Sequence, residues 1–193
     1  SIAGDIDARN IVAAGVGTFI GAASFSADAT INGVTVGKGA NSVSTNVVLG
    51  ISALDASVTG DNNVAIGNVA MSDATTAADS TAVGAGALNA VTTGSYNTAV
   101  GKSALLLATT GSNNTAVGKD ALRANNADSN TAVGMDALTA NTTGTLNTAV
   151  GHLALGANTT ANRCTALGRS ALATNTTGDD NVAVGYYALT NSN

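Results

Sequence analysis

The nine residues NTAVGKSAL at positions 97–105 decide the fold, because close variants of them fill most of the chain. The variants NTAVGKDAL at 114–122 and NTAVGHLAL at 147–155 differ from it only in the two residues after the glycine. The glycines of nine such copies recur at one constant interval, except that the step from Gly118 to Gly134 is a residue shorter. They are Gly50, Gly67, Gly84, Gly101, Gly118, Gly134, Gly151, Gly168 and Gly185. So regular a period is typical of a solenoid, in which each repeat stacks on the next.

The positions of the repeat are restricted in size and polarity. The residue before the glycine is always aliphatic, and the fourth residue after it is Leu or Met, so Val100 and Leu105 are expected to belong to two core columns. Ala99 and Ala104 belong to columns that are almost always Ala, which leaves room for one methyl group. Thr98-Ala99-Val100 is expected to be a strand with Thr and Val on one face. The Gly-x-x-Ala-Leu piece is expected to form a second extended segment, and the Thr-Thr-Gly-Ser-x-Asn linkers are turn sequences.

These patterns predict an all-β fold, a β-solenoid or β-roll of nine coils of about 17 residues. Each strand would pair with its equivalent one coil along, at roughly 4.8 Å. The Asn before Thr-Ala-Val would then form an amide ladder. Its members are Asn63, Asn97, Asn114, Asn130, Asn147 and Asn181. A helical alternative is disfavoured because the glycines and turns leave fewer than about ten residues per helix, too short to be stable alone.

The two Ala columns also suggest an interface, since only small residues fit near a three-fold axis. We therefore expect a homotrimer, either intertwined or side by side. The end of a solenoid is an open sheet edge that must be covered. The segment Leu189–Asn193 contains no obvious cap, so we expect a partner, another copy or a further domain to cover it.

Residues 1–45 do not repeat and are expected to form a β-rich N-terminal shoulder or connector, followed by the solenoid at 46–193. Ala29–Gly37 alternates in polarity around Asn32-Gly33, a hairpin signal. The stretch Asn10–Ala27 is uncharged throughout, but its glycines, Ser and Thr dilute its hydrophobicity, and acidic residues precede it. Neither a membrane span nor a signal peptide is predicted there.

The composition excludes several classes of protein. A net charge of -5 with only seven Lys plus Arg argues against a nucleic-acid binder. One Cys and one His cannot form a zinc cluster, and one Cys cannot form an intrachain disulfide. The high apolar fraction comes largely from Ala, so the core must be thin. No cofactor is predicted.

The repeat at 97–105 and 147–155 resembles repeats of bacteriophage tail fibres, which often precede a self-cleaving chaperone domain. The sequence NNVAIG at 62–67 is similar to the Asn-Ser-Val-Ala-Ile-Gly repeats of trimeric autotransporter adhesin heads. The second resemblance implies a left-handed parallel β-roll and a homotrimer. Together they suggest a structural fibre module of a virion, attached to neighbouring fibre or virion proteins and serving host-surface attachment. A cell-surface adhesin head or a self-assembling extracellular filament is the alternative.

Few residues suggest binding chemistry. Lys102 and Lys119 occupy one column a coil apart, as do His152 and Arg169, so a stripe of cations could meet an anionic partner such as surface polysaccharide or phosphate. Tyr186 and Tyr187 form the only adjacent aromatic pair. We expect them to contact a downstream domain, with a sugar-stacking tip as the alternative.

No catalytic or metal site is predicted, and the chain is not expected to be an enzyme. His152 lies in the most variable column, which is typical of an exposed position. Cys164 replaces an Asn of the ladder and is expected to be an inert thiol, with an interchain or oxidation role as the alternative. A polysaccharide-degrading spike is disfavoured because no aromatic-lined cleft is evident. Ice binding is disfavoured because the residue two after Thr is always aliphatic.

The turn aspartates have the oxygen ligands that calcium prefers. They are Asp61, Asp79, Asp128, Asp179 and Asp180. Most copies have only one Asp in this turn, and the nonapeptide calcium-repeat pattern is missing, so solvated aspartates are expected.

Overall fold

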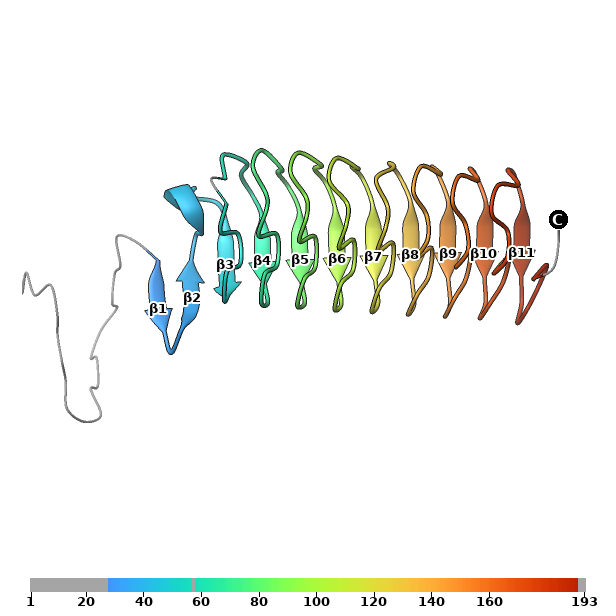
Figure 1. The fold of residues 1–193 in the computed structure, drawn as a ribbon, viewed down its shortest axis with the longest axis horizontal. Helices are drawn as coiled ribbons and strands as arrows, with labels where there is room; N and C mark the ends of the chain where they lie inside the picture. Colours follow the sequence, from blue (N-terminus) through green and yellow to red (C-terminus); the bar gives the residue numbers. More distant parts are fainter. Residues whose placement is uncertain (1–27, 57, 191–193) are drawn as a thin grey trace, which may run out of the picture.

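The computed structural model describes residues 28–56 and 58–190 and shows an elongated all-β molecule (Figure 1). Eleven strands form one sheet in chain order. They are β1 Ala29–Ile31, β2 Val34–Gly37, β3 Val47–Gly50, β4 Val64–Ile66, β5 Thr81–Val83, β6 Thr98–Val100, β7 Thr115–Val117, β8 Thr131–Val133, β9 Thr148–Val150, β10 Thr165–Leu167 and β11 Val182–Val184. A 3-10 turn, η1 (Ala40–Ser42), lies between β2 and β3. Strands β3–β11 are the nine predicted repeats, so the β-solenoid is confirmed.

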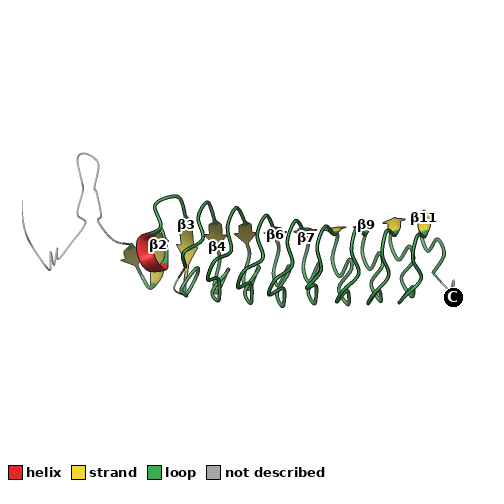
Figure 2. Cartoon of the chain, turned by 90° about the horizontal axis from the view of Figure 1, so that it is seen from above, coloured by secondary structure: helices red, strands yellow, loops and turns green. Residues whose placement is uncertain are grey.

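The solenoid strands pair in parallel and in register. Thr98 pairs with Thr115 and Val100 with Val117, so identical positions of neighbouring coils stand side by side. The step between partners is a residue shorter from β7 to β8, where Thr115 pairs with Thr131. The missing residue is therefore absorbed outside the strands, and the ladder continues without a break. Figure 2 shows that each coil is one short strand and a long loop.

The segment after each glycine is a chain of turns, which corrects the prediction of a second extended segment. Gly101 has φ 134°, and Ser103 and Leu105 have φ of 58° and 51°. With these turns, the N–H groups of Ser103 and Leu105 point in opposite directions along the axis. The Ser103 N–H donates to the Ala85 carbonyl of the preceding coil at 2.9 Å, and the Leu105 N–H donates to the Ala121 carbonyl of the next coil at 3.0 Å. Left-handed backbone at non-glycine residues is unfavourable, but here it bonds each coil to both neighbours.

The interior of the solenoid is lined by the Ala and Leu columns. Ala99, Ala104 and Leu105 are fully buried, whereas Val100 is 37% exposed. The prediction that the residue before the glycine belongs to the core is therefore wrong. A strand has one inward and one outward face, and the narrow coil accepts the Ala methyl opposite Leu, so the larger aliphatic residue faces outward. Burial of each Leu side chain stabilises the fold by roughly 1.5–3 kcal/mol relative to leaving it exposed to water.

This arrangement also removes the predicted role of the Ala columns. Ala99 and Ala104 pack inside the chain's own coil, so they cannot approach a symmetry axis. Close packing inside the solenoid also explains why the column of Gly101 contains only glycine. A Cβ added there would lie 2.6 Å from the carbonyl oxygen of Gly118, because the backbones of successive coils stack closely at this corner.

The predicted Asn ladder is confirmed, and its members bond in two directions. The Asn97 side chain crosses the interior and donates from Nδ2 to the Gly111 carbonyl at 2.8 Å. Its Oδ1 accepts from the Asn114 N–H of the next coil at 3.0 Å. Asn63 and Asn147 make the same two bonds. Each amide thus holds its own coil closed and fastens the coil that follows.

A second buried amide column, which the sequence analysis missed, runs through the later coils only. It consists of Asn125, Asn141, Asn158 and Asn175. Asn141 Nδ2 donates to Asn125 Oδ1 at 2.6 Å, and Asn158 Nδ2 donates to Asn141 Oδ1 at 2.7 Å. The signal was the change from Ala-Thr-Thr-Gly at 108–111 to Asn-Thr-Thr-Gly at 141–144.

The predicted hairpin of the N-terminal segment is confirmed. Strands β1 and β2 pair antiparallel around Asn32 and Gly33, whose φ angles of 50° and 80° fit a type I′ turn. Strand β2 then pairs antiparallel with β3, so the hairpin extends the solenoid sheet at its first edge. The stretch Asn10–Ala27 lies outside the described residues. Within the described ones, no helix is long and apolar enough to cross a membrane.

Candidate interaction surface

The outward side of strands β3–β11 is a regular, uncharged surface, which we call the Val/Thr face. Each strand contributes its first and third residue of the Thr-Ala-Val pattern, and none of these side chains is charged. The first column is Val47, Val64, Thr81, Thr98, Thr115, Thr131, Thr148, Thr165 and Val182. The second column is Leu49, Ile66, Val83, Val100, Val117, Val133, Val150, Leu167 and Val184. The Thr column thus stands beside an aliphatic column and not beside a second Thr column.

Exposed apolar side chains gather on this face. Among the described residues, eight of the exposed large apolar side chains belong to its two columns: Val47, Leu49, Val100, Val117, Val133, Leu167, Val182 and Val184. Five more lie at the two ends of the strands, namely Ile51, Tyr96, Met135, Leu146 and Tyr186. Outside this face and its two ends, Leu107, Tyr187 and Leu189 of the coils are exposed to 45%, 46% and 48%. Most of the exposed large apolar side chains of the coils therefore lie on or beside the Val/Thr face.

The end of the face where the strands begin carries negative charge, and we call it the acidic flank. Its charged residues stand five or six positions before each glycine: Asp61, Asp79, Asp128, Arg163, Asp179 and Asp180. Arg163 donates to both carboxylate oxygens of Asp180, at 2.6 and 2.8 Å. This guanidinium holds the pKa of Asp180 below its ordinary value.

The other end of the face is the basic flank, formed by the residue directly after each glycine. It carries the four predicted stripe residues, Lys102, Lys119, His152 and Arg169, with Met135 between the two pairs. Lys119 forms an ion pair with Asp120, and the hydrogen bond to that carboxylate raises the pKa of Lys119. His152 is half-buried, so it is less exposed than predicted. Binding of an anionic partner along this stripe stays a prediction.

The two adjacent tyrosines form a cluster with Arg169 in the last coils. The Tyr186 and Tyr187 rings meet edge to face with centroids 4.4 Å apart. The Arg169 guanidinium lies 5.5 Å and 5.8 Å from the two ring centroids and donates to the Tyr186 hydroxyl at 3.2 Å. Such a cation–π cluster is mutually stabilising. Both rings remain exposed, at 67% and 46%.

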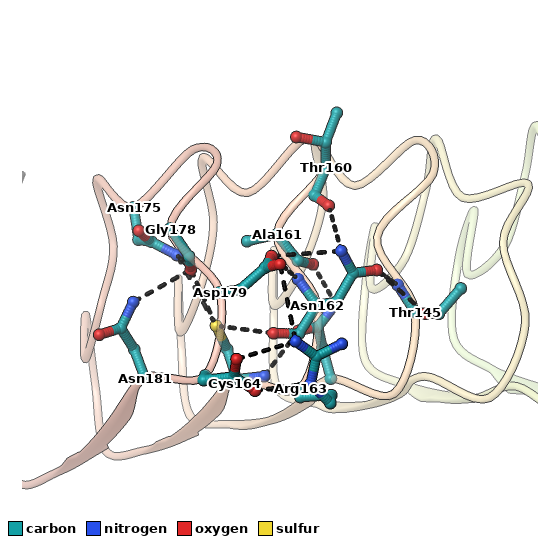
Figure 3. Close-up of polar contacts among 12 residues, drawn as sticks. Thr145, Thr160, Ala161, Asn162, Arg163, Cys164, Asn175, Gly178, Asp179 and Asn181 are labelled. Atoms are coloured by element: carbon teal, nitrogen blue, oxygen red, sulfur yellow. Dashed lines mark hydrogen bonds and ion pairs between the residues drawn. The ribbon is translucent and has the colours of Figure 1, made fainter.

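Cys164 lies inside the solenoid, as the ladder position predicts (Figure 3). Its thiol is within 3.2 Å of the Gly178 carbonyl, the position that an Asn amide reaches in other coils. Burial raises the pKa of the thiol, which lowers its reactivity. Nearby, Asn175 Nδ2 is directed at Cys164 Sγ, 3.8 Å away, and at Gly178.

The shortened coil has a shallow hollow on its outer wall. Its volume is about 350 Å³, and it is lined by Thr110, Asn126, Ala127, Asp128, Thr143 and Thr145. None of these side chains is aromatic. Asp128 accepts from the Ser112 N–H at 2.8 Å, and Asn126 accepts from the Thr109 N–H at 2.6 Å, so both are already used in joining coils. The hollow can therefore offer hydroxyl, amide and carboxylate hydrogen-bonding groups.

Within residues 28–56 and 58–190, no cluster of three or more His, Cys or Asp side chains could hold a metal ion. Asp61, Asp79 and Asp128 stand on separate coils. Cys164 points into the interior, whereas His152 belongs to an outward column, so the two do not form a nucleophile and base pair. Comparison with protein-family models, curated proteins and solved structures gives no match for this chain.

Proposed function

We propose that this chain is a structural fibre module, the stiff β-solenoid shaft of a phage tail fibre or other virion appendage that serves attachment to the host surface. The observation that carries the proposal is the ladder from β3 to β11, which runs without a break through nine coils. At about 4.8 Å per strand, these coils make a rod roughly 40 Å long. A rod of this kind keeps the parts at its ends apart and resists bending.

The bonding pattern supports a mechanical role. Each coil bonds to the coil before it and to the coil after it through the backbone, as at Ser103 and Leu105. The interior amides at Asn97 and Asn147 add side-chain bonds between coils. The resemblance of the repeats at 97–105 and 147–155 to tail-fibre repeats favours a virion location. In this proposal the shaft is a homotrimer that joins neighbouring fibre or virion proteins, and host polysaccharide is a candidate receptor.

A second candidate is the head of a trimeric cell-surface adhesin or a self-assembling extracellular filament. Its support is the coil of Asn63, whose sequence NNVAIG is similar to adhesin-head repeats. Both candidates use the same rod, and they differ in where the rod is anchored.

Immunogold electron microscopy tests the location. Antibodies against the purified chain would be applied to phage particles and to intact bacterial cells from the source culture. Labelling of thin appendages on phage particles is expected. Labelling confined to the bacterial surface would overturn the virion proposal in favour of the adhesin.

An activity assay tests the structural role against a spike enzyme. The purified chain would be incubated with host capsule polysaccharide, and the release of reducing ends would be measured. We expect no release above that of a heat-denatured control. Cleavage of the polysaccharide would overturn the proposal that the module is purely structural.

A further inference from the structure

We infer that the hollow of the shortened coil is a binding site for one neutral sugar residue, held through its hydroxyl groups by Asn126, Asp128 and the Thr110 N–H. The site reaches from the outer wall of the coils to Asp128 of the acidic flank and includes none of the predicted stripe cations. The inference rests on the proposed function, because it names the class of sugar that the fibre would bind in a host polysaccharide.

The hollow lies where one column of the solenoid has no member. The coils share a Thr two residues after the corner position, namely Thr59, Thr76, Thr93, Thr110, Thr143, Thr160 and Thr177. The coil of Gly118 lacks this residue. A ladder amide donates to the Ala127 carbonyl at 2.8 Å, as another does to the Gly111 carbonyl one coil earlier, so the next column continues at Ala127. The hollow is therefore lined by Thr110 and Thr143, which stand two coil spacings apart, about 10 Å.

The backbone beside the hollow has an open hydrogen-bond donor. In a full-length coil, the N–H of the Thr in this column donates to a carbonyl of the next coil, as from Thr93 to Thr109 at 3.2 Å. The same kind of bond is made by Thr76, Thr143 and Thr160. Thr110 precedes the short coil, and its N–H donates to no residue that the structure describes. This N–H is available to a ligand.

Two side chains of the hollow are held in place by one atom and leave the other atom free. Asn126 accepts through Oδ1 from the Thr109 N–H and hydroxyl, at 2.6 and 2.9 Å, and its Nδ2 donates to no described residue. Asp128 accepts through Oδ1 from the Ser112 N–H at 2.8 Å, and its Oδ2 accepts from no described residue. Both side chains are exposed. Groups that are fixed before binding lose little freedom when a ligand arrives.

The lining selects the class of ligand. Asp128 is the one charged side chain among the six lining residues, so a phosphate or a carboxylate would be repelled. A cation would gain one carboxylate, but it cannot accept from the Thr110 N–H or Asn126 Nδ2. A hydroxyl group can both donate and accept. A ligand with several hydroxyls, such as a sugar, therefore satisfies the carboxylate oxygen and both donors together.

The size of the hollow limits the ligand to one sugar ring. Its volume of about 350 Å³ lies near the lower end of the range of about 300–1,000 Å³ for small-molecule pockets. No aromatic side chain lines it, so no ring can stack on the sugar. We therefore expect a dissociation constant of about 1 mM for a single sugar. Several such sites in one fibre would bind a polysaccharide more tightly than one alone.

Amide NMR spectra of the purified, isotope-labelled chain test the site, because the Thr110 N–H is itself observed. The probes are the methyl glycosides of glucose, galactose, mannose and N-acetylglucosamine, with inorganic phosphate as the anionic probe. At least one glycoside should shift the Thr110 signal in a saturable way, and phosphate should not. No shift with any glycoside, or a larger shift with phosphate, would overturn the inference.

An insertion tests whether the hollow itself is the site. A Thr placed between Asn126 and Ala127 gives this coil the length of its neighbours and fills the open column. The variant should keep its circular dichroism spectrum, because the other coils have Thr there, and it should lose glycoside binding. A folded insertion variant that still binds would contradict the site.

A substitution tests the carboxylate without removing its bond between coils. Asp128→Asn keeps an oxygen for the Ser112 N–H and removes the free carboxylate oxygen, so the dissociation constant should rise about tenfold or more. Asp179→Asn is the matched control, since Asp179 accepts from the Asn162 N–H at 2.8 Å in the same column of a full-length coil. The control should bind as the unchanged chain does. An equal loss in both variants would show that the effect is one of overall charge and would overturn the site.

The two proposals fail separately. If a glycoside shifts the Thr110 signal while the microscopy labels only bacterial cells, the fibre assignment falls and the sugar site stands. If phage appendages are labelled and no glycoside binds, the sugar site falls and the fibre assignment stands.

Discussion

The early and late coils close the same interior corner in different ways. Seven residues after the glycine, the coils of Gly67, Gly84 and Gly101 have Ala74, Val91 and Ala108, all fully buried. From Gly118 onward the same position holds Asn125, Asn141, Asn158 and Asn175, also buried. The buried Leu column continues through both halves, with Met71 as a substitution in the coil of Gly67, and the strands of the Gly101 and Gly151 coils are identical in sequence. The comparison therefore isolates one corner, closed by apolar packing in one half and by amides in the other.

The difference shows how buried hydrogen bonds can add to the stability of a thin apolar core. In the early half, the Gly111 carbonyl accepts from Asn97 alone among the side chains that the structure describes. In the late half, the equivalent Gly144 carbonyl accepts from both Asn130 and Asn141 at 2.8 Å. Buried amides stabilise only when their partners are present, since an unpaired buried polar group costs about 1–3 kcal/mol. The late half is thus held by a network in which each amide depends on the next.

The largest loss of stability should come from the Leu column, and it should be equal in the two halves. Leu105→Ala and Leu155→Ala each open a cavity in the shared Leu column, and each should lower the free energy of unfolding by about 2–5 kcal/mol. Urea denaturation followed by circular dichroism would measure both. Leu107→Ala, on the outer wall, is the control and should change little. A large difference between the two interior variants would mean that the halves differ in more than one corner.

A smaller loss of unfolding free energy should follow when the amide of the late corner is replaced by an apolar residue, or the apolar residue of the early corner by an amide. Asn141→Ala removes one of the two acceptors of Asn158 Nδ2, which keeps only the Ala161 carbonyl at 3.2 Å, and it removes the donor to Asn125 Oδ1. Val91→Asn buries an amide oxygen between Ala74 and Ala108, where no amide can donate. Each should cost about 2 kcal/mol of unfolding free energy. The same denaturation experiment measures both. If Val91→Asn were stabilising, the early corner would not depend on apolar packing.

A gain in unfolding free energy is expected when an Asn is restored at a position where another residue interrupts the amide ladder. Asn158 Oδ1, in the second amide column, is the one buried side-chain polar atom without a hydrogen-bond partner among the described residues. Asn175 Nδ2, the equivalent of the donors that reach Asn125 and Asn141, is directed at Cys164 Sγ at 3.8 Å. Cys164→Asn should restore the bonds that Asn147 makes and raise the unfolding free energy by about 1 kcal/mol. Ser80→Asn is the matched change in the early half. A loss of stability in both variants would show that the ladder does not need a continuous run of amides.

The smallest effect should be a dependence on pH confined to the late half. Because Arg163 lowers the pKa of Asp180 in the folded state, their ion pair adds stability above the ordinary value of 3.8, and this stability is lost as the pH falls through the lowered pKa. Arg163→Gln should therefore lower the melting temperature slightly near neutral pH and not in strong acid. A difference that persists in acid would assign the effect to packing and not to charge. The pair is exposed, so salt should weaken it.

The repeat alone predicted the strands, their register and the first amide ladder, because a fixed period aligns identical residues in any stacked fold. It did not predict which side of the strand faces inward. Alternation separates Ala99 from Val100, but it does not say which is inside, and the larger residue was wrongly assigned to the core. The deciding fact was the width of the coil, which depends on the left-handed turns at Ser103 and Leu105. The residue types at these positions do not predict left-handed turns.

The candidate surface was predictable only in parts. The column of Lys102, Lys119, His152 and Arg169 was recognised as an outward one, and the aspartates were assigned to turns. Their relation to each other, as opposite flanks of one apolar face, required knowing that Val117 and its column point outward. The hollow beside Asp128 lies at the coil that is one residue shorter than the others, a shortening that is visible in the sequence.

The bonds between coils run along the rod, and this determines how it would yield to tension. A coil at a free end of the stack is held by one neighbour only, so a pull on the rod would detach such a coil before an interior one. When it detaches, a unit that occupied about 4.8 Å of length becomes about 17 residues of free chain, up to about 58 Å when extended. The remaining coils keep their register, so the next load meets an intact rod. A shaft built in this way would be rigid under small forces and would lengthen in steps of about 50 Å under large ones.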